Sequence, residues 1–211
     1  MRRYGHIPRT VSSRYNNRVY YFCIEWALYL FLQQDEKDLL ELCGQEGLNE
    51  EDMARLTRLL LNNDVSVNCC RKLTCDTPLM LLCSSKTDSL VSLLKMLLQR
   101  QDLDLSLRNR LGQNSLSLLC RNSQNVNMLH CVRLLVDRGT DVTSKDCYGR
   151  CCLNLLCRFY KGRDIIEITR LLIHPDMEAE DLQTCVDILR GRKLRHDLLE
   201  DLIRAMDRND D

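Results

Sequence analysis

The sequence predicts an all-α fold, a solenoid of stacked helix–turn–helix units with capping helices at its N- and C-terminal ends. A seven-residue segment, Thr77–Cys83, recurs twice in weakened form, and its last residue returns at intervals of 37 as Cys120 and Cys157. A fixed period with hydrophobic anchors in each unit indicates a repeat array. The 211 residues are 45% hydrophobic and include only 3 prolines, which favours an α-rich protein with short connections. Paired leucines keep the same period, at Leu97–Leu98, Leu134–Leu135 and Leu171–Leu172.

The first 34 residues divide into a basic segment and an apolar segment. Residues 1–18 contain five arginines, no acidic residue and no periodicity, so we expect a disordered basic arm. This arm is either a solvated tail or an element for localisation or phosphate contact. Residues 19–34 are rich in aromatic side chains and predict a capping helix over the open end of the array. Glu25 within this short apolar stretch, with no small-residue cleavage site nearby, argues against a signal peptide or a membrane span.

Residues 35–68 are expected to form a degenerate first unit. Its helices are predicted at Glu36–Cys43 and Glu50–Leu61, and the second begins with acidic residues that suit a helix N-terminus. The polar run Asn62–Asp64 should end this helix, because asparagine tolerates the left-handed conformation at such a position.

Three clearer units follow, each with a turn segment, a short helix that ends near the recurring cysteine, a polar loop and a second helix. Gly112 and Gly149 share one repeat position, where a turn would need a positive φ, and Cys75 takes this position in the first of the three. Gly139 is expected just beyond the end of a second helix. The units span residues 69–104, 105–141 and 142–177.

The pattern changes in residues 178–211. Two helices are predicted, Glu178–Arg190 and Leu194–Met206, on either side of Gly191. We expect a C-terminal capping pair, and the alternative is a docking helix for another subunit.

These motifs resemble the ankyrin repeat family over about residues 36–178. Thr77–Leu79 matches the T-P-L core of the family signature, Asp141–Val142 resembles its unit-closing residues, and the paired leucines match its second helix. The resemblance implies a scaffold that binds another protein. The period is four residues longer than the family's 33, with the surplus between the two helices, so we expect longer loops or an extra helical turn there. The family's histidine is replaced, which predicts loss of its cross-repeat hydrogen bond, at Met80, Ser117 and Asn154.

Thirteen cysteines follow the repeat pattern, and this placement favours reduced thiols in a cytoplasmic or nuclear protein that is not secreted. A disulfide network is the alternative. The recurring cysteine that closes each first helix fits a small buried position, whereas Cys69 and Cys147 lie near predicted turn tips and should be exposed. Cys147 and Cys151 have zinc-like spacing, but a structural zinc site needs two such pairs, so we expect no metal.

No catalytic or nucleotide-binding motif is present, so we expect neither an enzyme nor a bound cofactor. The net charge of zero gives no global electrostatic case for nucleic acid or membrane binding. The predicted turn tips nevertheless carry more basic than acidic residues, and in a stack these tips would align into a basic stripe. The residues that we expect to contact a partner are Arg71, Lys72, Arg108, Asn109, Arg110, Lys145, Asp146, Tyr148 and Arg150.

The sequence thus favours a non-catalytic module that uses its tips and first-helix face to bind a protein. The basic residues of the tips suit an acidic segment of that protein. One alternative is an adaptor whose C-terminal helices, residues 178–206, recruit a larger complex and leave Leu198, Leu202 and Met206 exposed. Another is nucleic-acid contact through the basic arm and the tip stripe, which would depend strongly on salt.

Overall fold

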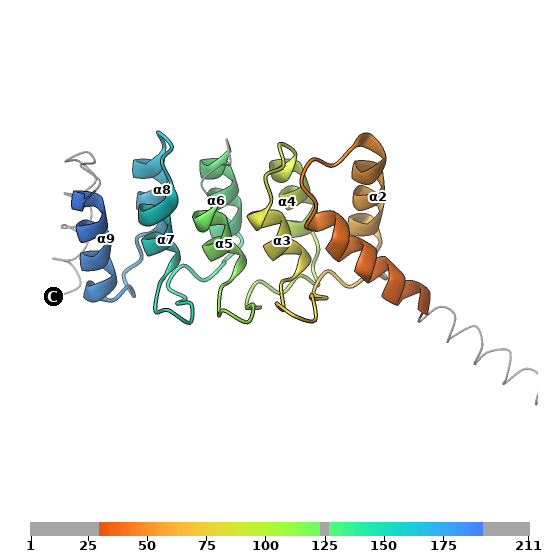
Figure 1. The fold of residues 1–211 in the computed structure, drawn as a ribbon, viewed down its shortest axis with the longest axis horizontal. Helices are drawn as coiled ribbons and strands as arrows, with labels where there is room; N and C mark the ends of the chain where they lie inside the picture. The colour runs from red at the N-terminus through yellow and green to blue at the C-terminus, as the bar shows by residue number, and fades with distance from the viewer. Residues whose placement is uncertain (1–29, 123–126, 192–211) are drawn as a thin grey trace, which may run out of the picture.

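The computed structural model describes residues 30–122 and 127–191, and every regular element within them is a helix (Figure 1). The all-α prediction is therefore confirmed. The helices form two layers, and each helix contacts the next one in its own layer. None of the helices in these two ranges has the length and apolar character needed to cross a membrane. One layer contains α3 (Pro78–Ser84), α5 (Ser115–Arg121), α7 (Cys152–Phe159) and α9 (Ala179–Gly191), and the other contains α2 (Glu50–Leu61), α4 (Leu90–Leu98), α6 (Met128–Asp137) and α8 (Ile165–Leu172).

The N-terminal end of the stack is formed by a helix over residues 30–43 (Figure 1). The sequence predicts separate helices on the two sides of residue 35, and this boundary is wrong because the helix continues through it. Its buried residues, Leu39, Leu42 and Cys43, join the core, so it packs as part of the stack. The predicted basic arm at residues 1–18, and the predicted helix as far as residue 29, lie outside the described residues.

Helix α2 begins and ends where the sequence predicts it to. The side chain of Asn49 accepts a hydrogen bond from the backbone N–H of Asp52 (2.8 Å), and three acidic residues occupy the first turn. The predicted left-handed conformation at its C-terminus is wrong, because Asn62 has φ −80° and ψ 111°. The carbonyl of Asn62 instead accepts a hydrogen bond from Arg100 (2.7 Å), which comes from the following unit.

Helices α3, α5 and α7 are preceded by N-cap residues of three different types, Thr77, Asn114 and Cys151. Thr77 Oγ1 accepts from the Met80 N–H at 3.4 Å, and Asn114 Oδ1 accepts from the Ser117 N–H at 2.9 Å. In α7 the donor and acceptor are exchanged, because the backbone N–H of the N-cap residue Cys151 donates to Oδ1 of Asn154 in the helix. Helices of seven or eight residues are marginal alone, so packing against neighbours on both sides stabilises them.

The surplus residues of the repeat lie in loops and not in an extra helical turn. Five residues join α3 to α4 and five join α7 to α8, at 85–89 and 160–164. Helix α6 ends at Asp137, and Gly139 lies just beyond this end with φ 88°, as the sequence predicts. The N–H groups of Gly139 and Thr140 donate to the carbonyls of Val136 and Leu135, which satisfies the last carbonyls of the helix locally.

Helices α2 and α4 have no glycine after their last turn, and arginines from the next unit supply the missing donors. Arg100 is only 7% exposed, and its guanidinium donates to the carbonyls of Leu60 (3.3 Å), Asn62 (2.7 Å) and Val65 (3.0 Å). Arg138 stands 38 residues later and donates to the carbonyls of Leu98 and Arg100. Each arginine therefore joins one unit to the unit before it.

The recurring cysteines are core residues, as predicted, and Cys83, Cys120 and Cys157 are fully buried. Eight of the twelve described cysteines are buried. Cys147 is exposed as expected, but the same prediction for Cys69 is wrong because this residue is half-buried, with its Sγ directed at the Glu36 carbonyl (3.9 Å).

The C-terminal end of the described stack is α9, which confirms the first helix predicted there. Its apolar face packs against α7, and Gly191 is its last residue. One bond at this contact corrects a prediction, since Asn154 Nδ2 donates to the carbonyl of Asp181 (2.9 Å) and so joins two units at a position where no such bond was expected. The second predicted helix, Leu194–Met206, lies outside the described residues.

Candidate interaction surface

Three turn tips, residues 71–76, 109–113 and 146–150, lie next to one another along one long side of the stack, at the bottom of Figure 1. Each tip is closed by one backbone hydrogen bond of 3.0 Å, from Asn109 N–H to Gln113 O in the second tip and from Asp146 N–H to Arg150 O in the third. The first tip is one residue longer and is closed from Arg71 N–H to Asp76 O.

The backbone of each tip passes through the left-handed region at the position that the repeat predicts. Gly112 has φ 72° and Gly149 has φ 71°, so the expectation for both glycines is confirmed. Cys75 occupies the same position with φ 61°, and it is the only non-glycine residue with positive φ in the described part of the chain. The backbone path is therefore preserved even where glycine is absent.

Two of the nine predicted contact residues build the tips. Asn109 Oδ1 accepts from the N–H groups of Leu111 and Gln113, and Asp146 Oδ1 does the same for the residues two and four positions on, at 3.0 Å in each case. Burial alone would raise the pKa of Asp146, but the hydrogen bonds from the Arg150 side chain and from these backbone N–H groups outweigh it and lower that pKa. Asn109 and Asp146 thus fix the tip conformation.

Backbone hydrogen bonds also join neighbouring tips into a ladder. The N–H of Arg110 donates to the carbonyl of Thr74 (2.9 Å), and the N–H of Cys147 donates to the carbonyl of Leu111 (2.8 Å). Successive tips are therefore held in register, and side chains on them form an ordered row.

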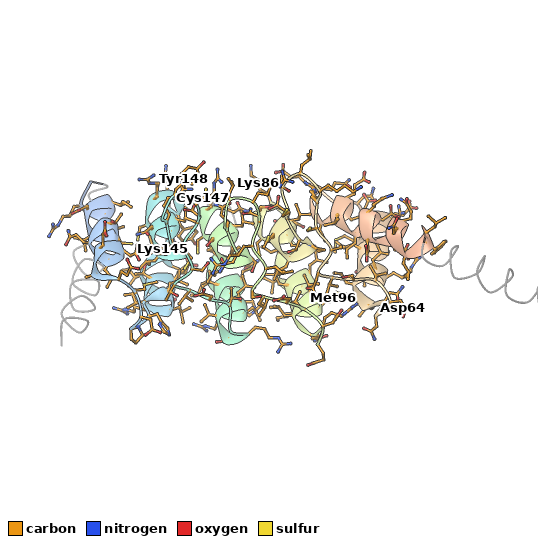
Figure 2. The ribbon with its side chains drawn as sticks, turned by 90° about the horizontal axis from the view of Figure 1, so that it is seen from below. Asp64, Lys86, Met96, Lys145, Cys147 and Tyr148 are labelled. Atoms are coloured by element: carbon orange, nitrogen blue, oxygen red, sulfur yellow. The ribbon has the colours of Figure 1, made fainter. Side chains whose placement is uncertain are left out.

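The row of tips lies on the side of the molecule that carries α3, α5 and α7. Figure 2 shows the stack from the tip end, with Cys147 and Tyr148 toward the same edge as Lys86, and with Met96 and Asp64 toward the opposite edge. The tips and the layer of α3, α5 and α7 therefore share one face.

Three of the six predicted basic contact residues pair with acids of the same chain. Arg108 lies 3.2 Å from Asp141, and Arg150 lies 2.7 Å from the buried carboxylate of its own tip. Lys145 contacts Glu178 at 2.7 Å and Asp181 at 3.1 Å, and the hydrogen bond to Glu178 raises the pKa of the lysine. The basic stripe is consequently weaker toward the third tip than the sequence suggests.

The other three basic residues, on the first and second tips, form no ion pair among the described residues. Arg71 donates to the carbonyl of Leu40 (3.3 Å), and Arg110 donates to the carbonyl of Lys72 (3.0 Å), while all three side chains remain exposed. A guanidinium bound to a carbonyl keeps its full positive charge. The uncompensated positive charge is thus concentrated on Arg71, Lys72 and Arg110.

The tips also present large apolar side chains to solvent. Leu73 is 80% exposed, Tyr148 is 66% exposed and Leu111 is 39% exposed. Tyr148 was predicted as a contact residue, and the guanidinium of Arg150 stacks 4.5 Å from the centre of its ring. Leu73 and Leu111 were missed, although their positions within the predicted turn tips could have indicated exposure.

Two hollows adjoin the row of tips. One, of about 380 Å³, lies between the third tip and α9 and is lined by Tyr148, Asn154 and Arg158 among others. The larger one, of about 1100 Å³, lies between the first tip and the helix at residues 30–43. Both open beside residues that the sequence predicts as partner contacts.

The described thiols and carboxylates do not assemble a metal site. Among the residues in the two described ranges, no three or more His, Cys, Asp and Glu side chains gather as a metal site would require. Burial raises the pKa of Cys69 and of Cys151 to about 12, so both thiols are protonated at neutral pH. These groups stabilise the stack and are not activated nucleophiles.

Comparison with known proteins gives no relative, since no family model matches the chain and no curated protein matches it.

Proposed function

We propose that this chain is a non-catalytic, ankyrin-like repeat solenoid that binds another protein through its turn tips and first-helix face. The main support is the row of tips, which presents exposed apolar side chains next to unpaired basic ones on a hydrogen-bonded backbone. The 37-residue period, the helix pairs and the linked tips support the repeat architecture.

The physical case for binding rests on preorganisation. Ordering a flexible loop on association opposes binding, and the backbone bonds from Arg110 and Cys147 have already ordered these tips. Tyrosine and arginine are enriched among the residues that dominate binding energy, and the row offers Tyr148 and Arg110 with two leucines beside them.

The partner surface should combine acidic and apolar side chains. Carboxylates on the partner would pair with the exposed basic side chains of Arg71, Lys72 and Arg110. An apolar group would pack between Leu73 and Leu111. Lys145 and Arg150 are already paired within the chain, so they contribute less than their charge alone suggests. This distribution favours a protein partner over a nucleic acid, which would be drawn to a continuous basic surface.

The test is affinity capture from a cell lysate followed by mass spectrometry. The wild type is compared with a tip variant that carries Arg71→Glu, Lys72→Glu and Arg110→Glu. The matched control carries Arg58→Glu, Lys95→Glu and Arg133→Glu, which make the same charge change at exposed residues of α2, α4 and α6, away from the tips. Circular dichroism establishes that both variants are folded.

We expect the tip variant to lose a set of proteins that the wild type and the control both retain. Equal capture by all three proteins would refute the proposed binding surface.

A further inference from the structure

The ladder of tips has an open end at the first tip. In the second and third tips, the N–H two residues before the positive-φ glycine donates to the preceding tip, from Arg110 and from Cys147. The corresponding group in the first tip is the N–H of Leu73, two residues before Cys75. No tip precedes it, and this N–H has no hydrogen-bond acceptor among the described residues.

The larger hollow lies beside this open end. Its volume is about 1100 Å³, and it is lined by one face of the helix at residues 30–43 and by residues 69–74 of the first tip. Leu40 and Leu73 contribute apolar surface to it from opposite sides. A space of this size exceeds the usual range of small-molecule sites and suits a segment of polypeptide.

The walls of the groove are tied together. Cys69 Sγ contacts the carbonyl of Glu36 at 3.9 Å, and Arg71 donates to the carbonyl of Leu40 at 3.3 Å. These contacts hold the helix beside the tip, so the groove is formed before a ligand arrives.

The charges of the groove favour an acidic ligand. The lining contains three basic residues, Lys37, Arg71 and Lys72, against Glu36 and Glu41. Neither lysine forms an ion pair within the described residues. A carboxylate on the ligand therefore meets ammonium groups that have no competing partner there.

We propose that this groove binds an extended segment of a partner protein, which adds to the open end of the tip ladder. A backbone carbonyl of the segment accepts the hydrogen bond from Leu73 N–H, as Thr74 and Leu111 accept from the tips that follow them. An apolar side chain of the segment packs between Leu40 and Leu73, and a carboxylate lies beside Lys72. This inference rests on the proposed function, because it assigns one site and one conformation to the protein partner.

The probe is a phage-displayed library of random twelve-residue peptides, selected against the full chain. Selected peptides are synthesised, and their affinity is measured by fluorescence anisotropy. Amide exchange of the free and peptide-bound wild-type protein is followed by NMR, which reports on the Leu73 N–H with no substitution at all.

We expect selected peptides to contain an acidic and an apolar residue and to slow exchange of the Leu73 amide at least tenfold. Lys72→Glu and Leu73→Ser keep the backbone intact and should each weaken binding about tenfold. Leu61→Ser, a matched change at an exposed leucine of α2 away from the tips, should alter affinity less than twofold.

Three results would overturn the inference. These are failure to select any peptide, binding that leaves the Leu73 amide unprotected, and sedimentation that shows the groove filled by a second copy of the chain. If lysate capture still depends on the tips while the Leu73 amide stays unprotected, only the open-end site fails. If capture is also independent of the tips, the proposed function fails with it.

Discussion

Arg100 provides the sharpest test of how the units are held together. Its guanidinium reaches back across the contact between two units and donates to the carbonyls of Leu60, Asn62 and Val65. It also forms two 2.7 Å hydrogen bonds with Asp102. We expect Arg100→Met to keep the aliphatic packing while it removes every one of these donors.

The expected loss follows from the burial of the acceptors. The carbonyls of Leu60 and Val65 are buried where they meet Arg100, and each hydrogen bond from a charged donor contributes about 1.5–3 kcal/mol. The Asp102 side chain is 50% exposed, so its ion pair adds less than about 1 kcal/mol. Arg100→Met should therefore lower the free energy of unfolding by about 3–5 kcal/mol, and Asp102→Asn by less than about 1 kcal/mol.

Urea denaturation followed by circular dichroism measures both changes, and amide exchange locates them. Amides of α2 should exchange faster in Arg100→Met while those of α7 change little, because each unit contacts only its neighbours. Arg100→Lys should lie between the two, since one ammonium cannot serve several separated carbonyls. If Asp102→Asn destabilises as much as Arg100→Met, or if Arg100→Met costs under about 1 kcal/mol, the carbonyl bonds are not the source of the stability.

Four further outcomes are expected. Gly112→Ala should lower the free energy of unfolding by about 2 kcal/mol and Gly149→Ala by about 1 kcal/mol. Both have positive φ, but an added Cβ meets backbone at 3.3 Å only at Gly112, so urea denaturation should separate them. Cys75→Gly relieves the same left-handed strain and should raise stability by up to about 1 kcal/mol in that assay; a loss would contradict this. Asn114→Ala removes a helix cap and a bond to the carbonyl of Asp141, at a cost of about 2 kcal/mol, and Asn114→Ser should restore only the cap. The carboxyl of Asp146, despite its burial, is held by hydrogen bonds at a pKa below its ordinary 3.8. Its stabilising effect is complete above pH 3.8 and disappears as the pH falls through the lower folded pKa, so an acid titration of Asp146→Asn should be flatter there than that of the wild type.

The features that the sequence predicts well are those set by local rules. The bounds of α2 follow from its acidic first turn and from the polar run that succeeds it. Positive φ at Gly112 and Gly149 follows from their shared repeat position, and the same position in the first tip holds Cys75. Such features depend on a few neighbouring residues, and in a periodic sequence the same local signal occurs in several units.

The features that the sequence does not reveal are bonds between units. The polar run after α2 suggests a local, left-handed end, but Asn62 stays extended because Arg100 satisfies its carbonyl from 38 residues away. Likewise, the resemblance to a repeat family that has histidine at the position of Asn154 predicts a missing bond, and the Asn154 amide makes a different one to Asp181. Charge pairing follows the same logic, since the pairing of Lys145 with Glu178 becomes visible only when the third tip lies beside α9.

The candidate surface shows the same division. The sequence predicts that basic residues occur on the tips, because their repeat positions are local. It does not predict that Arg108 is paired while Arg110 is not, because Asp141 lies 33 residues further along the chain. The sequence also does not predict that Leu73 is 80% exposed.

The arginine contacts also form late during synthesis, because each arginine follows its carbonyl acceptors in the chain. The carbonyl of Leu60 belongs to a helix that is complete long before its donor is translated, since Arg100 follows 40 residues later. At 5–20 residues per second this interval lasts roughly 2–8 s. The nascent first unit therefore exists for seconds with its α2 carbonyls in water, whereas α6 acquires its own closing bonds as soon as Thr140 emerges. A truncation after residue 99 would make that transient state permanent, and removal of the first unit would leave only an unused guanidinium.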